Sequence, residues 1–157
     1  APDQKLALSG TVGAQNTPPP GYNRWAGANQ LAPEASAIND DPDGDGSTNL
    51  LEFAMGTSPK TANGNALGMM RLGNTILISF LQLERLDDGL GEDPGNVDYV
   101  VQSTDDLKSG EWTDTGIVPT LSVDQDNLPA DADYCRVEFE VSPSAAAKFY
   151  RVKVIDP

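Results

Sequence analysis

Residues 134–141, Tyr-Cys-Arg-Val-Glu-Phe-Glu-Val, alternate apolar and charged side chains along the chain. The apolar side chains that share one face are Cys135, Val137, Phe139 and Val141. The charged side chains that share the other face are Arg136, Glu138 and Glu140. A period of two is typical of a β-strand with one buried face. The stretch therefore predicts a strand that walls a β-sheet core, with Cys135 as a small buried hydrophobe.

Further strands are predicted on either side of this one. Residues 69–72 and 75–83 flank Gly73 and Asn74, which is the pattern of a β-hairpin. Both faces of residues 75–83 are apolar, so this strand is expected in the middle of a sheet. Residues 97–103 and 149–155 also alternate. The fold class predicted is mainly β, an antiparallel β-sandwich or small barrel behind a short helical front.

The helical front precedes these strands. Residues 22–31 are compatible with a short helix anchored in the core by Trp25, and Pro33 favours a further turn. Residues 49–55 are expected to form a helix that ends at Gly56. Three parts are predicted: a linker or arm over 1–20, a helical metal-binding segment over 21–60, and a β-sandwich over 69–157 that packs with that segment as one unit.

Composition excludes several classes of function. The chain of 157 residues has 24 acidic and 10 basic side chains, a formal net charge of −14, and no histidine. Nucleic-acid binding needs a basic footprint, which ten scattered cations do not supply. No apolar run is long enough for membrane insertion. Without histidine the usual nucleophile–base pairs are absent, so we expect no enzyme, although paired carboxylates would not need histidine.

One loop carries a strong motif. Residues 41–52 read Asp-Pro-Asp-Gly-Asp-Gly-Ser-Thr-Asn-Leu-Leu-Glu, which matches an EF-hand-type calcium loop at each constrained position. Side-chain oxygens are expected from positions 1, 3, 5 and 12, with a backbone carbonyl at position 7 and a ligand acting directly or through water at position 9. The predicted metal ligands are Asp41, Asp43, Asp45, Ser47, Asn49 and Glu52.

The loop is expected to act alone. Position 8, often a large aliphatic residue that pairs two such loops, is Thr48, and the chain has no second complete loop. A solitary site of this kind favours a structural calcium clip over a paired sensor. Acidic stretches at 124–133 and 87–93 could hold a second calcium, but both lack the turn glycine and terminal glutamate at loop spacing. They are interpreted as solvated acidic loops.

The motif extends into a wider resemblance. The loop, followed by Asn49-Leu-Leu-Glu-Phe-Ala and by Gly56-Thr-Ser-Pro, resembles the thrombospondin type 3-like and dockerin-like calcium repeats of secreted bacterial proteins. Together with Trp25, residues 99–103, Trp112 and Phe149-Tyr-Arg-Val, it is similar to C-terminal modules of large exported proteins of Verrucomicrobia and related bacteria. The resemblance implies a calcium-stabilised accessory domain, secreted or at the cell surface.

The function expected from this resemblance is structural and interaction-mediating, without catalysis. Its partners would be other domains of a larger exported protein or an extracellular partner, with a glycan as one alternative. A carbohydrate-binding module would use exposed aromatic side chains, for which Trp112 and Tyr99 are the candidates. Dockerin-like docking is a third alternative, but dockerins carry two loop repeats and this chain has one. The single cysteine does not decide the compartment.

Overall fold

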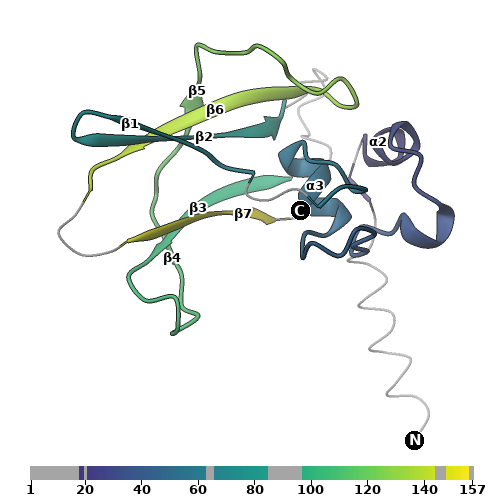
Figure 1. Cartoon of the computed structure of the whole chain (residues 1–157), viewed down its shortest axis with the longest axis horizontal. Helices are drawn as coiled ribbons and strands as arrows, with labels where there is room; N and C mark the ends of the chain where they lie inside the picture. Colours follow the sequence, from purple (N-terminus) through teal and green to yellow (C-terminus); the bar gives the residue numbers. More distant parts are fainter. Residues whose placement is uncertain (1–17, 20, 63–65, 85–96, 144–147, 156–157) are drawn as a thin grey trace, which may run out of the picture.

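A computed structural model describes residues 18–19, 21–62, 66–84, 97–143 and 148–155. The predicted linker over 1–20 therefore lies almost entirely outside the described residues. None of the helices in the described ranges has the length and apolar character needed to cross a membrane. The described residues form a helical front and two β-sheets (Figure 1).

The helical front consists of α2 (Tyr22–Ala28), a 3-10 turn η1 (Pro33–Ala35) and α3 (Asn49–Met55). The prediction that the first helix reaches residue 31 is wrong, because the helix ends at Ala28. Gln30 adopts a left-handed φ of 54°, and the Leu31 amide donates back to the Ala26 carbonyl. This geometry closes the last turn and prevents the helix from continuing.

Three aromatic rings hold the front together. The rings of Tyr22, Trp25 and Phe53 lie with centroids 5.5 to 5.6 Å apart in each pair. Trp25 is fully buried, which confirms its predicted role as a core anchor. Aromatic pairs in tilted or edge-to-face contact stabilise a core beyond their buried area. The cluster therefore fixes α2 against α3, the helix that carries Glu52.

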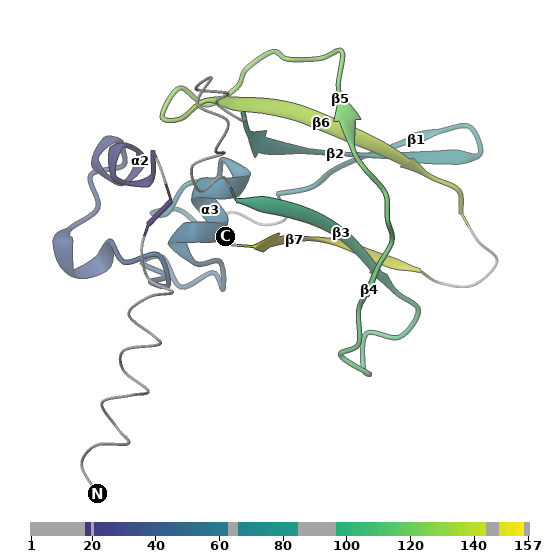
Figure 2. The same ribbon diagram turned by 180° about the vertical axis from the view of Figure 1, so that it is seen from behind.

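The β part is a pair of antiparallel sheets, as predicted, and it is a sandwich of two layers. The first sheet has the order β1-β2-β6-β5 and the second has the order β4-β3-β7. The strands are β1 (Gly68–Leu72), β2 (Thr75–Leu83), β3 (Asp98–Thr104), β4 (Thr113–Asp114), β5 (Thr120–Leu121), β6 (Tyr134–Val141) and β7 (Phe149–Ile155). Figure 2 shows the two layers from the opposite side, with α3 at one end of the sandwich.

The predicted pairing of β1 with β2 and the central place of β2 are confirmed. β2 lies between β1 and β6, and Ile78 and Phe80 are buried in the space between the sheets. β6 buries the face that alternation predicted, including Cys135. Val101 of β3 reaches the same core from the second sheet. The sequence pattern did not indicate β4 and β5, because a strand of two residues is too short to show alternation of apolar and polar side chains.

The front and the sandwich are joined by packing and by hydrogen bonds. Met55, the last residue of α3, belongs to the core between the sheets. Arg24 of α2 forms an exposed ion pair with Asp133, next to the start of β6. Two tyrosine hydroxyls also reach the end of α3 from the sandwich. These contacts tie α3 to the sheets.

Candidate metal centre

The acidic loop runs from η1 to α3, and its two ends are joined by backbone hydrogen bonds. The Asn49 amide donates to the Asp40 carbonyl at 2.8 Å, and the Leu50 amide donates to the Ile38 carbonyl at 2.9 Å. Ile38 is buried with the aromatic cluster of the front. The loop therefore closes on a packed base, which limits how far its carboxylates can spread.

Three aspartates fold the loop around themselves. Asp41 accepts hydrogen bonds from the Gly44 amide at 2.8 Å and the Gly46 amide at 3.0 Å. Asp43 accepts from the Asp45 amide at 3.1 Å, and Asp45 accepts from the Ser47 amide at 2.8 Å. These bonds to backbone amides hold each carboxylate in one orientation. One carboxylate oxygen from each of the three aspartates lies within 4.8 Å of those of the other two.

The turn depends on glycine. Gly44 has φ of 75° and Gly46 has φ of 96°, values that side-chain-bearing residues rarely adopt. A Cβ at either position would meet no atom within 4 Å, so the requirement for glycine is one of backbone conformation and not of space. Gly46 thus supplies the turn glycine that an EF-hand-type loop requires at its sixth position.

Glu52 lies in the first turn of α3 and is fully buried, with 0% of its surface exposed. Neither of its carboxylate oxygens has a hydrogen-bond partner among the described residues. Buried polar atoms are almost always paired, so an unpaired buried carboxylate needs an explanation. Of the six buried side-chain polar atoms without a partner in the described chain, four belong to loop residues: one in Asp43, one in Asn49 and two in Glu52.

The electrostatics of Glu52 follow from its position. Burial is the main cause that raises the pKa of Glu52 from 4.5 to about 8, and the negative charges of Asp43, Asp45 and Asp41 add to the shift. The carboxyl group is thus coupled to all three aspartates. A cation placed among them would remove both causes, because it compensates for lost hydration and reverses the sign of the local field.

Asn49 has a structural task besides its predicted place in the ligand set. Its side-chain amide donates to the carbonyls of Ala35 and Ala37, each at 2.9 Å, and so ties α3 to η1. Its side-chain oxygen is buried and has no partner among the described residues. The same amide partly offsets the effect of burial on Tyr22, whose pKa is raised to about 12. The sequence indicated Asn49 as a ligand position but not this link.

The arrangement can hold a metal ion. The aspartates at 41, 43 and 45 supply converging carboxylates, which is the grouping expected from the motif. Glu52 approaches the same loop from α3 and is electrostatically coupled to it. Ser47, whose backbone carbonyl is the predicted ligand, follows Gly46, and its backbone amide donates a hydrogen bond to the Asp45 carboxylate. An exposed cluster of acids alone would not indicate a ligand, but the buried, unpaired carboxylate of Glu52 does.

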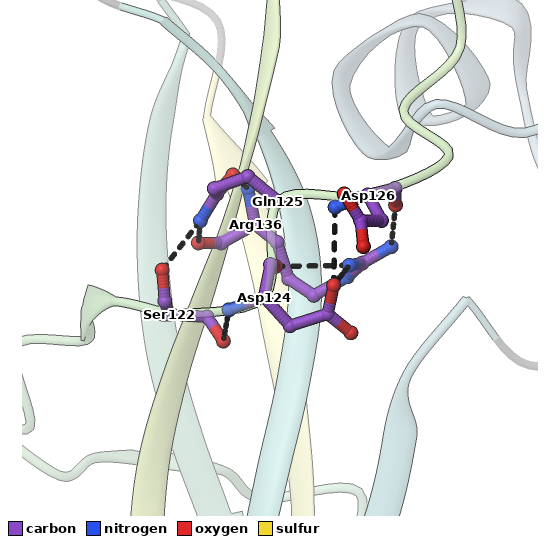
Figure 3. A network of polar contacts seen from close by, with 5 residues as sticks. All are labelled: Ser122, Asp124, Gln125, Asp126 and Arg136. Atoms are coloured by element: carbon purple, nitrogen blue, oxygen red, sulfur yellow. Dashed lines mark hydrogen bonds and ion pairs between the residues drawn. The ribbon is translucent and has the colours of Figure 1, made fainter.

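The acidic stretch at 124–133 is organised around an arginine at its beginning, whereas Asp131 accepts from Asn29 and Asp133 pairs with Arg24 near its end. Arg136 of β6 donates to the carbonyls of Asp124 at 2.9 Å and Asp126 at 3.1 Å, and it forms an ion pair with the Asp124 carboxylate at 3.2 Å (Figure 3). Gln125 closes the network by accepting from the Arg136 amide and donating to the Ser122 carbonyl. The guanidinium supplies the positive charge here. The other acidic stretch, 87–93, lies outside the described residues.

The two aromatic candidates for a sugar site serve contacts within the protein. Tyr99 donates its hydroxyl to the Ala54 carbonyl at 2.7 Å, accepts from the Leu83 amide at 3.0 Å and packs its ring on Phe80. Trp112 is half-buried, and the Arg151 guanidinium lies 4.3 Å from the centre of its ring. Both side chains are thus engaged within the protein, and a sugar would have to compete with these contacts.

Two tyrosine hydroxyls cap the C-terminal end of α3, a role that the sequence did not indicate. The last carbonyls of a helix lack partners within the helix. Tyr134 donates to the Phe53 carbonyl at 2.7 Å, and Tyr99 donates to the Ala54 carbonyl. Burial raises the pKa of both tyrosines well above the ordinary value, so they remain neutral donors. Nothing in the local pattern identifies a partner 81 residues away.

Comparison of the chain with protein-family models, curated proteins and solved structures finds no match. The features of the molecule that bear on its function are therefore the acidic loop and the contacts of α3.

Proposed function

We propose that this chain is a non-catalytic calcium-binding structural and interaction module of an exported bacterial protein. The observation that carries the proposal is the carboxylate of Glu52, which is fully buried and unpaired beside three converging aspartates. Removing one carboxylate from water without a partner is costly, and four like charges in one loop repel one another. A bound cation would compensate for both effects.

The donor set favours calcium among the metal ions. It contains only oxygen, which hard cations prefer, and it has no histidine or cysteine that would favour zinc or copper. Asp41, Asp43, Asp45, the Ser47 carbonyl and a bidentate Glu52, with Asn49 directly or through water, would supply the six to eight oxygens that calcium takes. Magnesium requires near-octahedral geometry and usually keeps several waters, which fits this many protein oxygens less well.

The role proposed for the metal is to hold the front and the sandwich in one arrangement. Glu52 would clamp the ion from α3, while Met55, Tyr134 and Tyr99 join the same helix to the sheets. The partners proposed are other domains of a larger exported protein or an extracellular protein. Export and a secreted or cell-surface location are supported by the resemblance of the loop and its flanking residues to repeats of secreted bacterial proteins.

The absence of catalysis is proposed on chemical grounds. The chain has no histidine, and its one cysteine is buried with its pKa raised by that burial. The carbohydrate-binding module stays a prediction. It is not the preferred proposal, because the side chains of Trp112 and Tyr99 are engaged in contacts within the protein.

Calorimetric titration of calcium into chelator-treated protein tests the proposal. We expect one calcium per chain, and we expect Glu52→Gln to weaken binding strongly because it removes the bidentate clamp. The matched control is Glu140→Gln, the same change at an exposed position of β6, which should bind as the unmodified protein does. An absence of heat with the unmodified protein, or equal binding by both variants, would overturn the calcium proposal.

A further inference from the structure

A groove separates the beginning of α3 from β7, on the side of the sandwich away from β4. Its volume is about 470 Å³. Thr48, Leu50 and Leu51 line one wall, and residues 151–154 of β7 line the other. In both views the C-terminal end of β7 runs beside α3 (Figures 1 and 2). One wall of the groove is therefore the exit of the proposed calcium loop, and the other is the edge of a sheet.

The register shows which backbone groups of β7 point into this groove. The Thr115 amide donates to the Val101 carbonyl at 2.9 Å, so the polar groups of Val101 face β4. Backbone groups alternate in direction along a strand, so those of Val100 and Gln102 face β7. These two residues lie opposite Lys153 and Arg151. The amides and carbonyls of Arg151 and Lys153 are thus used within the sheet.

The residues between them have the opposite orientation. The amides and carbonyls of Tyr150, Val152 and Val154 point away from β3, toward the open edge. Among the described residues, no backbone hydrogen bond outside the sheet reaches these three. A row of free donors and acceptors at every second residue is a template for another strand.

Side-chain chemistry along β7 specifies what such a strand would carry. Tyr150, Val152 and Val154 pack against the sandwich core, and Leu50 and Leu51 continue the apolar surface on the facing wall. Arg151 and Lys153 lie on the exposed face, where Arg151 donates to the Gln102 side chain at 2.9 Å and lies over the Trp112 ring, so Lys153 is the cation that would face a carboxylate of the added strand. Side chains directly opposite one another favour opposite charges. The fitting segment would alternate apolar residues toward the core with carboxylates toward the solvent.

We propose that β7 accepts an extended segment of a partner protein in which apolar and acidic side chains alternate. The segment would add as a fourth strand to the sheet β4-β3-β7. A second copy of this chain fits less well, because two β7 edges in antiparallel pairing would bring Arg151 and Lys153 of one copy beside the same cations of the other. The inference rests on the interaction role proposed above and names the chemistry of its partner.

The test uses a labelled, terminally blocked peptide, Ile-Glu-Leu-Glu-Ile, whose sequence does not occur in this chain, and a charge-reversed peptide, Ile-Lys-Leu-Lys-Ile. Binding is followed by fluorescence anisotropy in saturating calcium, and amide exchange is followed by nuclear magnetic resonance. We expect the acidic peptide to bind at least about tenfold more tightly than the basic one. Peptide addition should slow exchange at Tyr150, Val152 and Val154 and leave Arg151 and Lys153, already protected by β3, almost unchanged.

Charge exchange gives the second arm. Lys153→Glu should weaken binding of the acidic peptide and strengthen binding of the basic peptide. Lys108→Glu, the same change at an exposed site outside the groove, should leave both affinities unchanged. Equal binding of both peptides, no binding, protection at another strand, or self-association through β7 would each overturn the inference. Calcium binding is measured on the same samples, so failure of the metal site and failure of strand docking are separate results.

Discussion

The hydroxyl of Tyr134 donates a buried hydrogen bond 2.7 Å long to the carbonyl of Phe53, the residue that follows Glu52. Tyr134 starts β6, and Phe53 lies within the aromatic cluster of the front. This bond therefore joins α3, which carries the candidate metal ligand Glu52, to β6, which has its longest pairing with β2. It also satisfies a carbonyl that the end of a helix leaves without an intrahelical partner.

Tyr134→Phe should destabilise the protein by about 1–3 kcal/mol, the cost of leaving a buried polar group unpaired. Denaturant unfolding measures the change. The matched control is Tyr150→Phe on β7, since no hydrogen bond of the Tyr150 hydroxyl joins it to another described residue; its effect should stay within about 0.5 kcal/mol. Equal losses in the two variants would contradict the role assigned to the Tyr134 hydroxyl.

Calcium should raise the thermal midpoint of the protein relative to the same protein in excess chelator. At free calcium of about 100 times the dissociation constant, binding to the native state alone adds about 2.7 kcal/mol. Differential scanning calorimetry of Glu52→Gln should show little dependence on calcium. A midpoint of the unmodified protein that does not move between calcium and chelator would remove the metal from its proposed structural role.

In chelator, stability should fall as pH rises from about 4.5 to about 8. Folding raises the pKa of Glu52 from 4.5 to about 8, so in this range the folded state holds a proton that the unfolded state has released. Stability falls with pH wherever the native state binds more protons, and this contribution is complete below the unfolded value. Thermal midpoints across this range measure the slope, and Glu52→Gln should flatten it.

Calcium should reverse that dependence, because the metal competes with the proton for the Glu52 carboxylate. Binding near pH 7 should therefore release a proton, which calorimetry in two buffers of different ionisation enthalpy detects. A binding enthalpy that is the same in both buffers would mean that Glu52 is already ionised before the metal binds.

Gly46→Ala and Gly27→Ala should change stability in opposite directions. A Cβ at either position meets nothing within 4 Å, so space does not distinguish them. Gly46 has φ of 96°, where alanine is strained by about 1–2 kcal/mol, whereas Gly27 lies inside α2, where alanine gains about 0.4–1 kcal/mol. Unfolding in chelator measures both. Stabilisation by Gly46→Ala would show that the turn does not need a left-handed residue.

Much of the fold could be predicted because its signals are local. The alternation in residues 134–141 predicted both the bounds of β6 and its buried face. The apolar character of both faces of residues 75–83 predicted a strand between two others, and β2 has that position. The first helix was predicted too long, since a left-handed Gln30 ends it and no glycine or proline signals that turn.

The candidate metal loop was also local in its signal, because acids, glycines and spacing all lie within residues 41–52. The sequence alone determined the acidic loop and the long strands. Only the tertiary structure decided that Glu52 is buried without a partner, that Arg136 supplies the cation in the second acidic stretch, and that Tyr134 caps α3. Burial and long-range hydrogen bonds depend on which segments pack together, and no period or spacing within one segment records that choice.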